Sequence, residues 1–349
     1  MIMDIHLHLS HGMPLEEAVA YFKKLMHRNN VEKITLLSIP SSGVLTQTQN
    51  LFVLAAKQEL FPDCFAYMGL THEAGHADYL TQLERGLKLG FDGLKILESK
   101  PDIQKRLGLR MSDPMFDEMY SRAEELNLPI LMHVADPITS WDRNKIDKWA
   151  LEHGRCYDGP GFLSREDLYD DVEQILQKHP NLRLTLAHFY FLADEPERAD
   201  DFLSRHPTVC FDLTPGKEMY LSFSANPEKS ADFFRKYADR LYFGTDVNDG
   251  NVFDYHCDLY HLVKDMLCSS APFDLWGNHY IPLGLEKTVC DKIFRNNHRN
   301  LLGDTPKPIC QQAVQEELKR LKGLYDTLST YDKKSLSYLN EKYEYFIRC

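Results

Sequence analysis

The sequence predicts an α/β fold in which eight strands alternate with helices. Short apolar runs recur through the first 246 residues, and the gaps between them hold stretches with helical patterning or helix-capping residues. Strands that alternate with helices form a parallel sheet, and right-handed crossovers close such a sheet into a barrel. Although 349 residues would suggest about two domains, barrels of this kind often form one domain of ~250 residues.

The first strand is predicted at residues 3–9. A period of two places Asp4, His6 and His8 on one face and apolar residues on the other. Two imidazoles on a buried face are costly unless they are satisfied, and a metal ion is the usual way to satisfy them. The pattern is short, so by itself it also fits a half-exposed strand with two incidental histidines.

The next three strands and four helices follow in alternation. The strands are predicted at residues 33–39, 64–70 and 91–97, and the helices at residues 14–29, 47–60, 76–89 and 113–127. Pro14 opens the first helix with acids after it, and both are favoured in a first turn. The run at 33–39 is rich in β-branched residues and ends before Pro40.

The second half of the chain continues the pattern. Residues 128–134 are almost continuously apolar, as in a strand buried on both faces, and are followed by a long connection at 135–161 that we expect to form an ordered lid. Ser164 is the expected N-cap of the next helix. The remaining elements are strands at 182–188, 208–213 and 240–246 and helices at 164–178, 196–205 and 226–239.

These elements predict a (βα)8 TIM barrel with a long loop after strand 5 and a C-terminal helical extension. Helices at 255–268 and 285–301 complete the barrel domain, which we place at residues 1–303. Residues 304–349 form the extension, expected as a helical pair from Pro308 onward. A capping role, or a contact in a homo-oligomer, is its expected use.

Composition narrows the class of protein and its partners. With 43% hydrophobic and 26% charged residues the chain is typical of a soluble globular protein, and its net charge of -12 argues against nucleic acid or anionic lipid as the main partner. No apolar run approaches the ~20 residues of a membrane span. The eight cysteines include no Cys-x-x-Cys, and no apolar leader precedes the first strand, so we expect free thiols in a reducing cytoplasm.

Polar residues end several of the predicted strands. In a barrel the reactive groups lie at the carboxyl ends of the strands. His6 and His8 end strand 1, and the other residues in such positions are Lys95, His133, His188 and Asp246. Four histidines and an aspartate that meet at one mouth predict a metal site.

On these residues the chain resembles the amidohydrolase superfamily, and within it the amidohydrolase-2 branch. The motifs that carry the resemblance span residues 1–303 and are Asp4-Ile5-His6-Leu7-His8, Gly93-Leu94-Lys95, Met132-His133, His179-Pro180-Asn181, Ala187-His188-Phe189, Phe243-Gly244-Thr245-Asp246, and Asn296 and Asn297 before Leu301-Leu302-Gly303. The resemblance implies a metal-dependent hydrolase that uses an activated water on an amide, lactone or ester of a small carboxylate-bearing molecule. A non-oxidative decarboxylase of an aromatic or unsaturated acid is the alternative within the branch.

The resemblance also implies roles for the residues. His6, His8 and His133 would be metal ligands, Asp246 a ligand or proton acceptor, and His188 the group that polarises the carbonyl or protonates the leaving group. One Zn²⁺ suits this set, and Mn²⁺ or Fe²⁺ can occupy similar sites. Lys95 would be a fixed cation, or a carbamate that bridges a second metal bound by His188.

Substrate contacts are harder to place, and each candidate has an ordinary alternative. Arg143, Arg155 and Lys217, with Arg110, lie in loops after strands and are expected either to bind a substrate carboxylate or to be surface charges. Trp141 and Phe189, with Tyr157, Tyr190, Phe191 and Tyr220, either line an apolar wall or pack under the loops.

Two further classes stay open. A phosphoesterase of the polymerase-and-histidinol-phosphatase type also begins with a similar Asp-x-His-x-His strand, although the eight strand signals fit the amidohydrolase order better. A barrel that serves only as a scaffold is the non-enzymatic alternative, and unsatisfied buried imidazoles argue against it.

Overall fold

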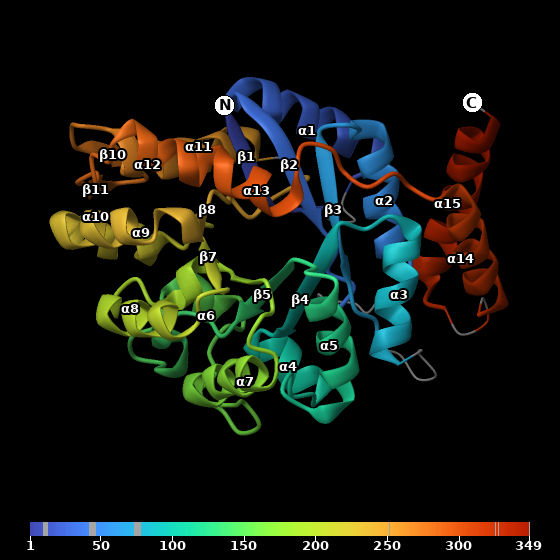
Figure 1. Cartoon of the computed structure of the whole chain (residues 1–349), viewed down its shortest axis with the longest axis horizontal. Helices are drawn as coiled ribbons and strands as arrows, with labels where there is room; N and C mark the ends of the chain where they lie inside the picture. Colours follow the sequence, from blue (N-terminus) through green and yellow to red (C-terminus); the bar gives the residue numbers. More distant parts are fainter. Residues whose placement is uncertain are drawn as a thin grey trace.

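The computed structural model describes the chain except residues 10–12, 42–46, 73–77, 251, 325, 327 and 349. Parallel strands form one curled sheet in the order β8-β7-β6-β5-β4-β3-β2-β1-β9, and helices surround it (Figure 1). The strands are β1 (Ile2–His8), β2 (Val31–Leu37), β3 (Cys64–Gly69), β4 (Gly93–Ser99), β5 (Ile130–Val134), β6 (Leu184–Leu186), β7 (Cys210–Asp212), β8 (Leu241–Tyr242) and β9 (Val247–Asn248). The predicted TIM-barrel class is confirmed.

The sheet closes through residues 241–248. β8 pairs with β7 at one end of this segment, and β9 pairs with β1 at the other. Between them the Ile5 amide donates to the Phe243 carbonyl at 3.0 Å, and the Asp246 amide donates to the His6 carbonyl at 2.8 Å. β8 and β9 are therefore the two ends of one eighth strand that seals the barrel and carries Asp246 to its mouth.

Each predicted helix of the strand–helix repeats is present in the structure, although further short helices lie between them. They are α1 (Leu15–Asn29), α2 (Gln49–Leu60), α3 (Tyr79–Leu89), α4 (Pro101–Leu107), α5 (Asp117–Glu125), α6 (Lys148–Glu152), α7 (Arg165–Lys178), α8 (Pro196–Arg205), α9 (Lys217–Ala225), α10 (Pro227–Lys236), α11 (Phe253–Cys268), α12 (Lys287–Asp291), α13 (Asn297–Leu302), α14 (Gln311–Gly323) and α15 (Thr330–Arg348). Ser164 caps α7 with a capping box that includes Asp167, as its sequence predicted.

Several local predictions were wrong. α4, α6, α9 and the hairpin β10 (Phe273–Leu275) and β11 (Asn278–Tyr280) lie in segments expected to be loops, because short elements carry too little periodicity to be recognised. The helix predicted over 285–301 is interrupted by a π-helix at Lys292–Asn296. The start of the helix predicted at 76–89 lies outside the described residues.

The simple alternation expected for β1 is also incomplete. Its register with β2 shifts between Asp4 and Leu7. Ile5 packs with Leu37, Tyr67 and Leu131 in the barrel interior, whereas Leu7 belongs to the larger core between sheet and helices. The irregularity separates two apolar residues that a strict period of two would place on the same face.

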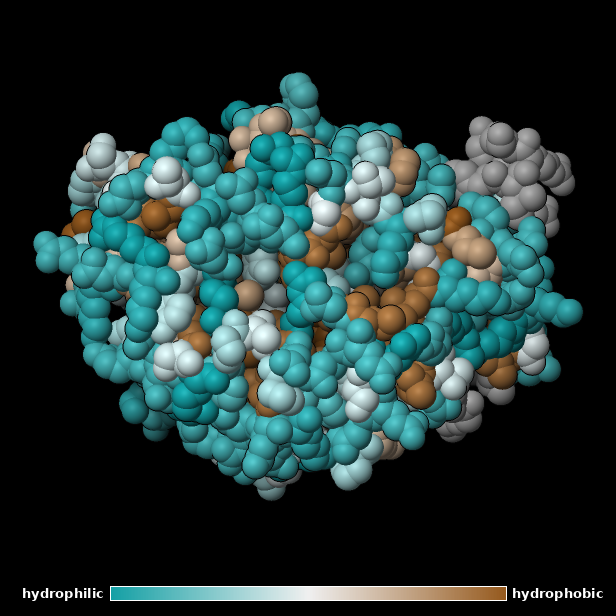
Figure 2. Space-filling model, viewed as in Figure 1, coloured by the Kyte–Doolittle hydropathy of each residue, from teal (hydrophilic) through white to brown (hydrophobic). Residues whose placement is uncertain are grey.

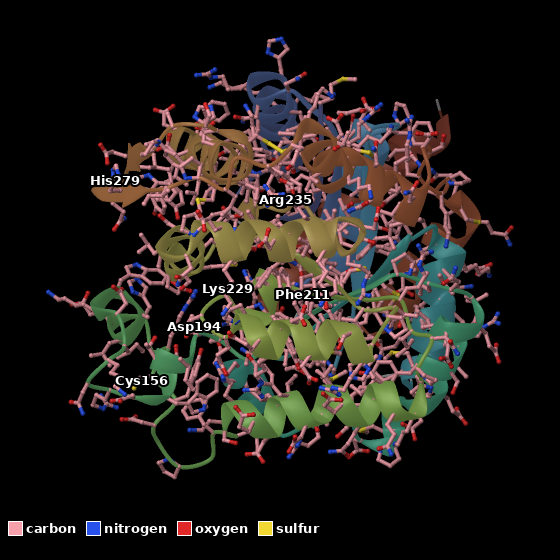
Figure 3. All side chains as sticks on the ribbon, turned by 60° about the vertical axis from the view of Figure 1, so that its left-hand side comes forward. Cys156, Asp194, Phe211, Lys229, Arg235 and His279 are labelled. Carbon is pink, nitrogen blue, oxygen red and sulfur yellow. A yellow bond between two sulfur atoms is a disulfide. The ribbon has the colours of Figure 1, made fainter. Side chains whose placement is uncertain are left out.

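Outer helices carry much of the exposed charge. Glu166 of α7 pairs with Arg198 of α8, and Glu197 of α8 pairs with Lys229 of α10. Helix α10 lies beside α8, and Lys229 is labelled between them in Figure 3. Hydrophilic residues cover most of the face in Figure 2, and hydrophobic ones form separate small patches. No described helix is long and apolar enough to cross a membrane.

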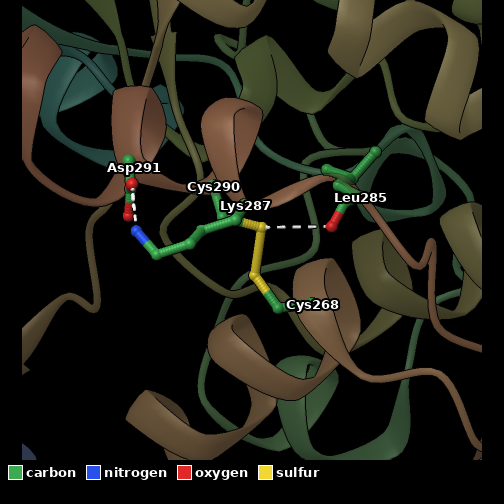
Figure 4. Close-up of a disulfide and its surroundings, with 5 residues drawn as sticks. All are labelled: Cys268, Leu285, Lys287, Cys290 and Asp291. Atoms are coloured by element: carbon green, nitrogen blue, oxygen red, sulfur yellow. Dashed lines mark hydrogen bonds and ion pairs between the residues drawn. A yellow bond between two sulfur atoms is a disulfide. The ribbon is translucent and has the colours of Figure 1, made fainter.

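Cys268 at the end of α11 and Cys290 in α12 form a disulfide (Figure 4). The expectation that the thiols are free is therefore wrong for this pair, because residues 22 positions apart are brought together by the fold and not by a local motif. The free cysteines among the described residues are Cys64, Cys156, Cys210, Cys257 and Cys310.

The start of the eighth strand is held by a buried amide. Asn297 in α13 donates from Nδ2 to the carbonyls of Ala238 at 2.7 Å and Leu241 at 2.8 Å. We predict that N297A leaves both carbonyls without this donor and lowers the free energy of unfolding by about 2 kcal/mol. Urea denaturation measures the change, and N296A at the exposed neighbouring position is the control. Equal stabilities of the two variants would contradict this role.

Candidate metal centre

His6, His8 and Asp246 converge at the end of β1. Their side-chain donor atoms lie within 4.8 Å of one another. The two Nε2 atoms are 3.1 Å apart, and Asp246 Oδ1 lies 3.5 Å from His6 Nε2 and 3.1 Å from His8 Nε2. Both imidazoles face the carboxylate because the eighth strand pairs with β1 beside them.

The partner of each ring shows where its proton lies. His6 Nδ1 is 2.7 Å from Asp212 Oδ2, and His8 Nδ1 is 3.1 Å from the Leu37 carbonyl oxygen. A carboxylate or a carbonyl only accepts hydrogen bonds, so both rings carry their proton on Nδ1. Burial lowers the pKa of His6 to about 3, which keeps this ring neutral.

With the ring protons on Nδ1, the Nε2 atoms of His6 and His8 are directed at each other and at the Asp246 carboxylate. Acceptor atoms that meet at one point are stabilised by a cation placed among them. Two nitrogens and one oxygen are ligand atoms suited to a divalent transition metal. The donor set therefore fits the metal that the sequence predicts.

His133 and His188 form a second pair beside the first. His133 Nδ1 lies 3.1 Å from His188 Nε2, while the outer nitrogens face the carbonyl oxygens of Ala135 at 2.9 Å and Thr214 at 3.3 Å. Because both carbonyls accept, neutral rings present unprotonated nitrogens to each other here as well. Burial lowers the pKa of both rings to about 4.

The second pair is not part of the tight group. His133 contacts His188 and does not join the cluster of His6, His8 and Asp246. The His188 ring lies 5.6 Å from the His6 ring, centroid to centroid, so the two pairs are neighbours. The structure thus brings the five predicted residues to one mouth as a group of three beside a group of two.

Asp212 joins the two groups, and its part in the site was not predicted from the sequence. Its Oδ2 accepts from His6 Nδ1, and its Oδ1 accepts from the backbone N–H of His188 at 2.8 Å and from Thr214. Burial raises the pKa of Asp212, but His6 and these hydrogen bonds outweigh it and hold the pKa below its usual range. The available signal was a charged residue near the end of an apolar run.

Asp136 plays the corresponding part for His133. One oxygen of this buried carboxylate lies 3.3 Å from His133 Nε2, and the other accepts from Lys100 and from the Tyr157 hydroxyl. Tyr157 belongs to the long connection after β5. The predicted lid is thus tied to the histidine pair through one carboxylate.

Three strand ends at the mouth have left-handed backbone. Ala135, His188 and Asp246 have φ of 63°, 57° and 57°. After His188 the left-handed conformation continues through Phe191. Such a conformation costs about 1–2 kcal/mol for each non-glycine residue. Strain of this kind concentrates where side chains must be aimed at one point.

Lys95 on β4 is buried and reaches the same point. Its Nζ lies 3.5 Å from His6 Nε2. Burial lowers the pKa of Lys95 to about 8. The fold thus places Lys95 beside His6, one of the predicted metal ligands.

The predicted substrate cations are mostly engaged elsewhere. Arg143 forms a two-bond ion pair with Asp158, Arg155 lies over the Trp149 ring, and Arg110 is held by Asp171. Lys217 begins α9, and its side chain lies outside the described residues.

The predicted aromatic wall is divided. Phe189 packs among Phe211, Phe223, Phe233 and Phe234 in the core, so its expected place in the wall is wrong because the left-handed turn directs it away. Tyr190 and Tyr220 are buried in the same core. Phe191 stacks on His188, and Trp141 packs against Tyr157.

Comparisons with known proteins agree with this architecture. A family model described as amidohydrolase matches residues 44–303. An uncharacterised TIM-barrel protein from Bordetella bronchiseptica has a TM-score of 0.54 at 17% identity, over 87% of this chain and 98% of that one. No curated protein sequence gives a significant match.

Two decarboxylases have the same fold. The 2,6-dihydroxybenzoate decarboxylase from Rhizobium has a TM-score of 0.53 at 18% identity, over 86% of this chain and 99% of that one. The dihydroxybenzoic acid decarboxylase from Polaromonas sp. JS666, with bound manganese and 2-nitroresorcinol, has a TM-score of 0.52 at 14% identity, over 86% and 97%. At such identities the likeness is one of fold.

The position of Asp212 leads to a prediction. The asparagine side chain can donate from Nδ2 to His6 Nδ1. The proton of the His6 ring then moves from Nδ1 to Nε2, the nitrogen proposed to bind the metal. We expect D212N to weaken divalent-metal binding by about 10–100-fold, as measured by titration with a chelating dye. D201N, at an exposed position on α8, is the control. Unchanged affinity in D212N would contradict the tautomer assignment.

Proposed function

We propose, because the chain belongs to the amidohydrolase family, that it is a metal-dependent hydrolase. Its substrate would be an amide, lactone or ester of a small carboxylate-bearing molecule. The proposed ligands are His6, His8 and Asp246, with His133 completing the set when the second pair separates. We propose one Zn²⁺ as the ion, with Mn²⁺ or Fe²⁺ as alternatives.

One observation carries this proposal. The Nε2 atoms of His6 and His8 lie 3.1 Å apart with Asp246 Oδ1 beside them, and the Nδ1 partners hold the ring protons on the opposite side from these nitrogens. The Asp246 side chain is 41% exposed, so it also faces the solvent from which a water molecule would enter. A site with protein ligands and an open side is typical of a catalytic metal.

When bound, the ion supplies a Lewis acid that polarises the scissile carbonyl and acidifies a water molecule. Asp246 would accept the proton of the attacking water on its carboxylate. His188 carries its proton on Nδ1, so its Nε2 would take over the proton that Asp246 removes from the water and deliver it to the leaving group. This tautomer favours the leaving-group role of His188 over polarisation of the carbonyl by a neutral ring.

Lys95 would place the substrate. Its buried ammonium lies beside His6 and suits an anionic group on the molecule that enters. The alternative is a carbamate on Lys95 that bridges a second metal bound by His188. Metal stoichiometry, with the intact mass of the protein, separates the two, because one ion per chain and no added carbamate supports the fixed cation.

A decarboxylase is the second candidate. Proteins with this fold are described as dihydroxybenzoate decarboxylases, and one of them has bound manganese. The same centre would then bind a carboxylated aromatic acid. Release of CO₂ from hydroxybenzoates, with no turnover of lactones and amides, would replace the hydrolase by this candidate. Acid release from a lactone or amide without CO₂ supports the hydrolase.

Single substitutions test the proposed roles. We predict that H6A and D246A abolish turnover and lose most of the bound metal, since each removes a ligand, whereas H188A loses turnover but keeps most of the metal. Metal analysis and activity on the same preparation measure both effects. H279A, at an exposed position on β11, is the control. Loss of metal in H188A would instead indicate that His188 binds a second ion.

A further inference from the structure

The C-terminal extension reaches the barrel at the start of α2. α15 lies beside α2, and α14 lies beside α3 (Figure 1). Asp332 in the first turn of α15 is 2% exposed, and its Oδ1 accepts from the N–H groups of Gln47 and Thr48, each at 3.1 Å, and from the Thr48 hydroxyl at 2.7 Å. A residue distant in the sequence therefore satisfies the amides that precede α2.

This carboxylate serves two helices at once. Thr48 stands at the N-cap position of α2 but makes no side-chain cap of its own. The other oxygen of Asp332 accepts from the Ser329 hydroxyl at 3.0 Å, and Ser329 Oγ accepts from the Asp332 amide. Two positive helix N-termini thus meet at one buried negative charge, which favours both.

α2 in turn holds the ends of two strands at the barrel mouth. Gln49, its first residue, accepts from the Ile39 amide at 2.9 Å and donates to the Leu9 carbonyl at 3.2 Å. Leu9 follows His8, and Ile39 lies two residues after Leu37, whose carbonyl accepts from His8 Nδ1. A continuous series of contacts therefore connects Asp332 with the ring of a proposed metal ligand.

We propose that Asp332 is a positioning residue for the mouth of the barrel. It fixes the start of α2, so that Gln49 keeps the ends of β1 and β2 together and His8 stays directed at the metal centre. The C-terminal extension at 304–349, which the sequence marks only as an appendage, is on this view a support of the active site. The part that concerns metal binding rests on the proposed function, and the part that concerns the strand ends does not.

Tyr343 provides a matched control on the same helix. It is buried, and its hydroxyl donates to the Leu51 carbonyl in α2 at 3.0 Å, which docks α15 without touching the cap. Y343F and D332A each remove an α15–α2 contact, but only D332A removes the cap. D332N keeps an accepting oxygen in place and is the conservative variant.

The experiment compares these full-length variants in two measurements. Binding of Mn²⁺ is followed through the electron paramagnetic resonance of the free ion, and hydrogen exchange is followed at the amides of Ile39 and Thr48. We expect D332A to weaken Mn²⁺ binding about tenfold and to speed exchange at both amides, as supporting residues around a metal site do. Y343F should change neither, and D332N should retain most of the affinity.

The two measurements separate the possible failures. Mn²⁺ affinity and exchange in D332A that match Y343F would overturn the proposal and leave the extension a purely stabilising element. If the wild-type chain binds no Mn²⁺, the proposed metal centre is contradicted. Hydrogen exchange then decides the remaining question by itself, and faster exchange in D332A than in Y343F would show that Asp332 holds the strand ends. Q49A combined with D332A should show less than additive loss, because both act through the same contacts.

Discussion

The buried carboxylate of Asp212 is the interaction on which the arrangement of the site depends. It accepts hydrogen bonds from the His6 ring, the His188 backbone and Thr214. A charge in this position would be costly without partners, and it gains several strong ones. Because one oxygen sets the tautomer of His6 and the other fixes the turn that carries His188, both histidine groups take their positions from a single side chain of β7.

The fold supplies the frame around this point. The eighth strand pairs with β7 at one end and β1 at the other, so closing the barrel and delivering Asp246 are the same structural event. The backbone is left-handed at Ala135, His188 and Asp246, where three strands end at the mouth. The packed core and the capped helices stabilise a mouth that is itself strained.

The sequence predicted the barrel and the residues at its mouth because both follow from local patterns: apolar runs define strands, and the polar residue that ends a run is visible. Asp212 was missed because it lies within its apolar run and acts through a partner 206 positions away. Phe189 was placed at the mouth because it follows His188 in the sequence. Adjacent residues in left-handed backbone need not point the same way, and Phe189 packs in the core. The Cys268–Cys290 disulfide and the Asp332 cap arise from tertiary contacts that have no local signature.

The central claim is that the mouth of this barrel is a metal site built on the Nε2 atoms of His6 and His8 and the carboxylate of Asp246. A crystal structure grown with Mn²⁺, with anomalous scattering to identify the ion, tests it most directly. We predict an ion within about 2.0–2.3 Å of these three groups, with His6 Nδ1 still bonded to Asp212. An ion bound elsewhere, or a mouth that stays free of metal while its three groups bond to one another, would contradict it.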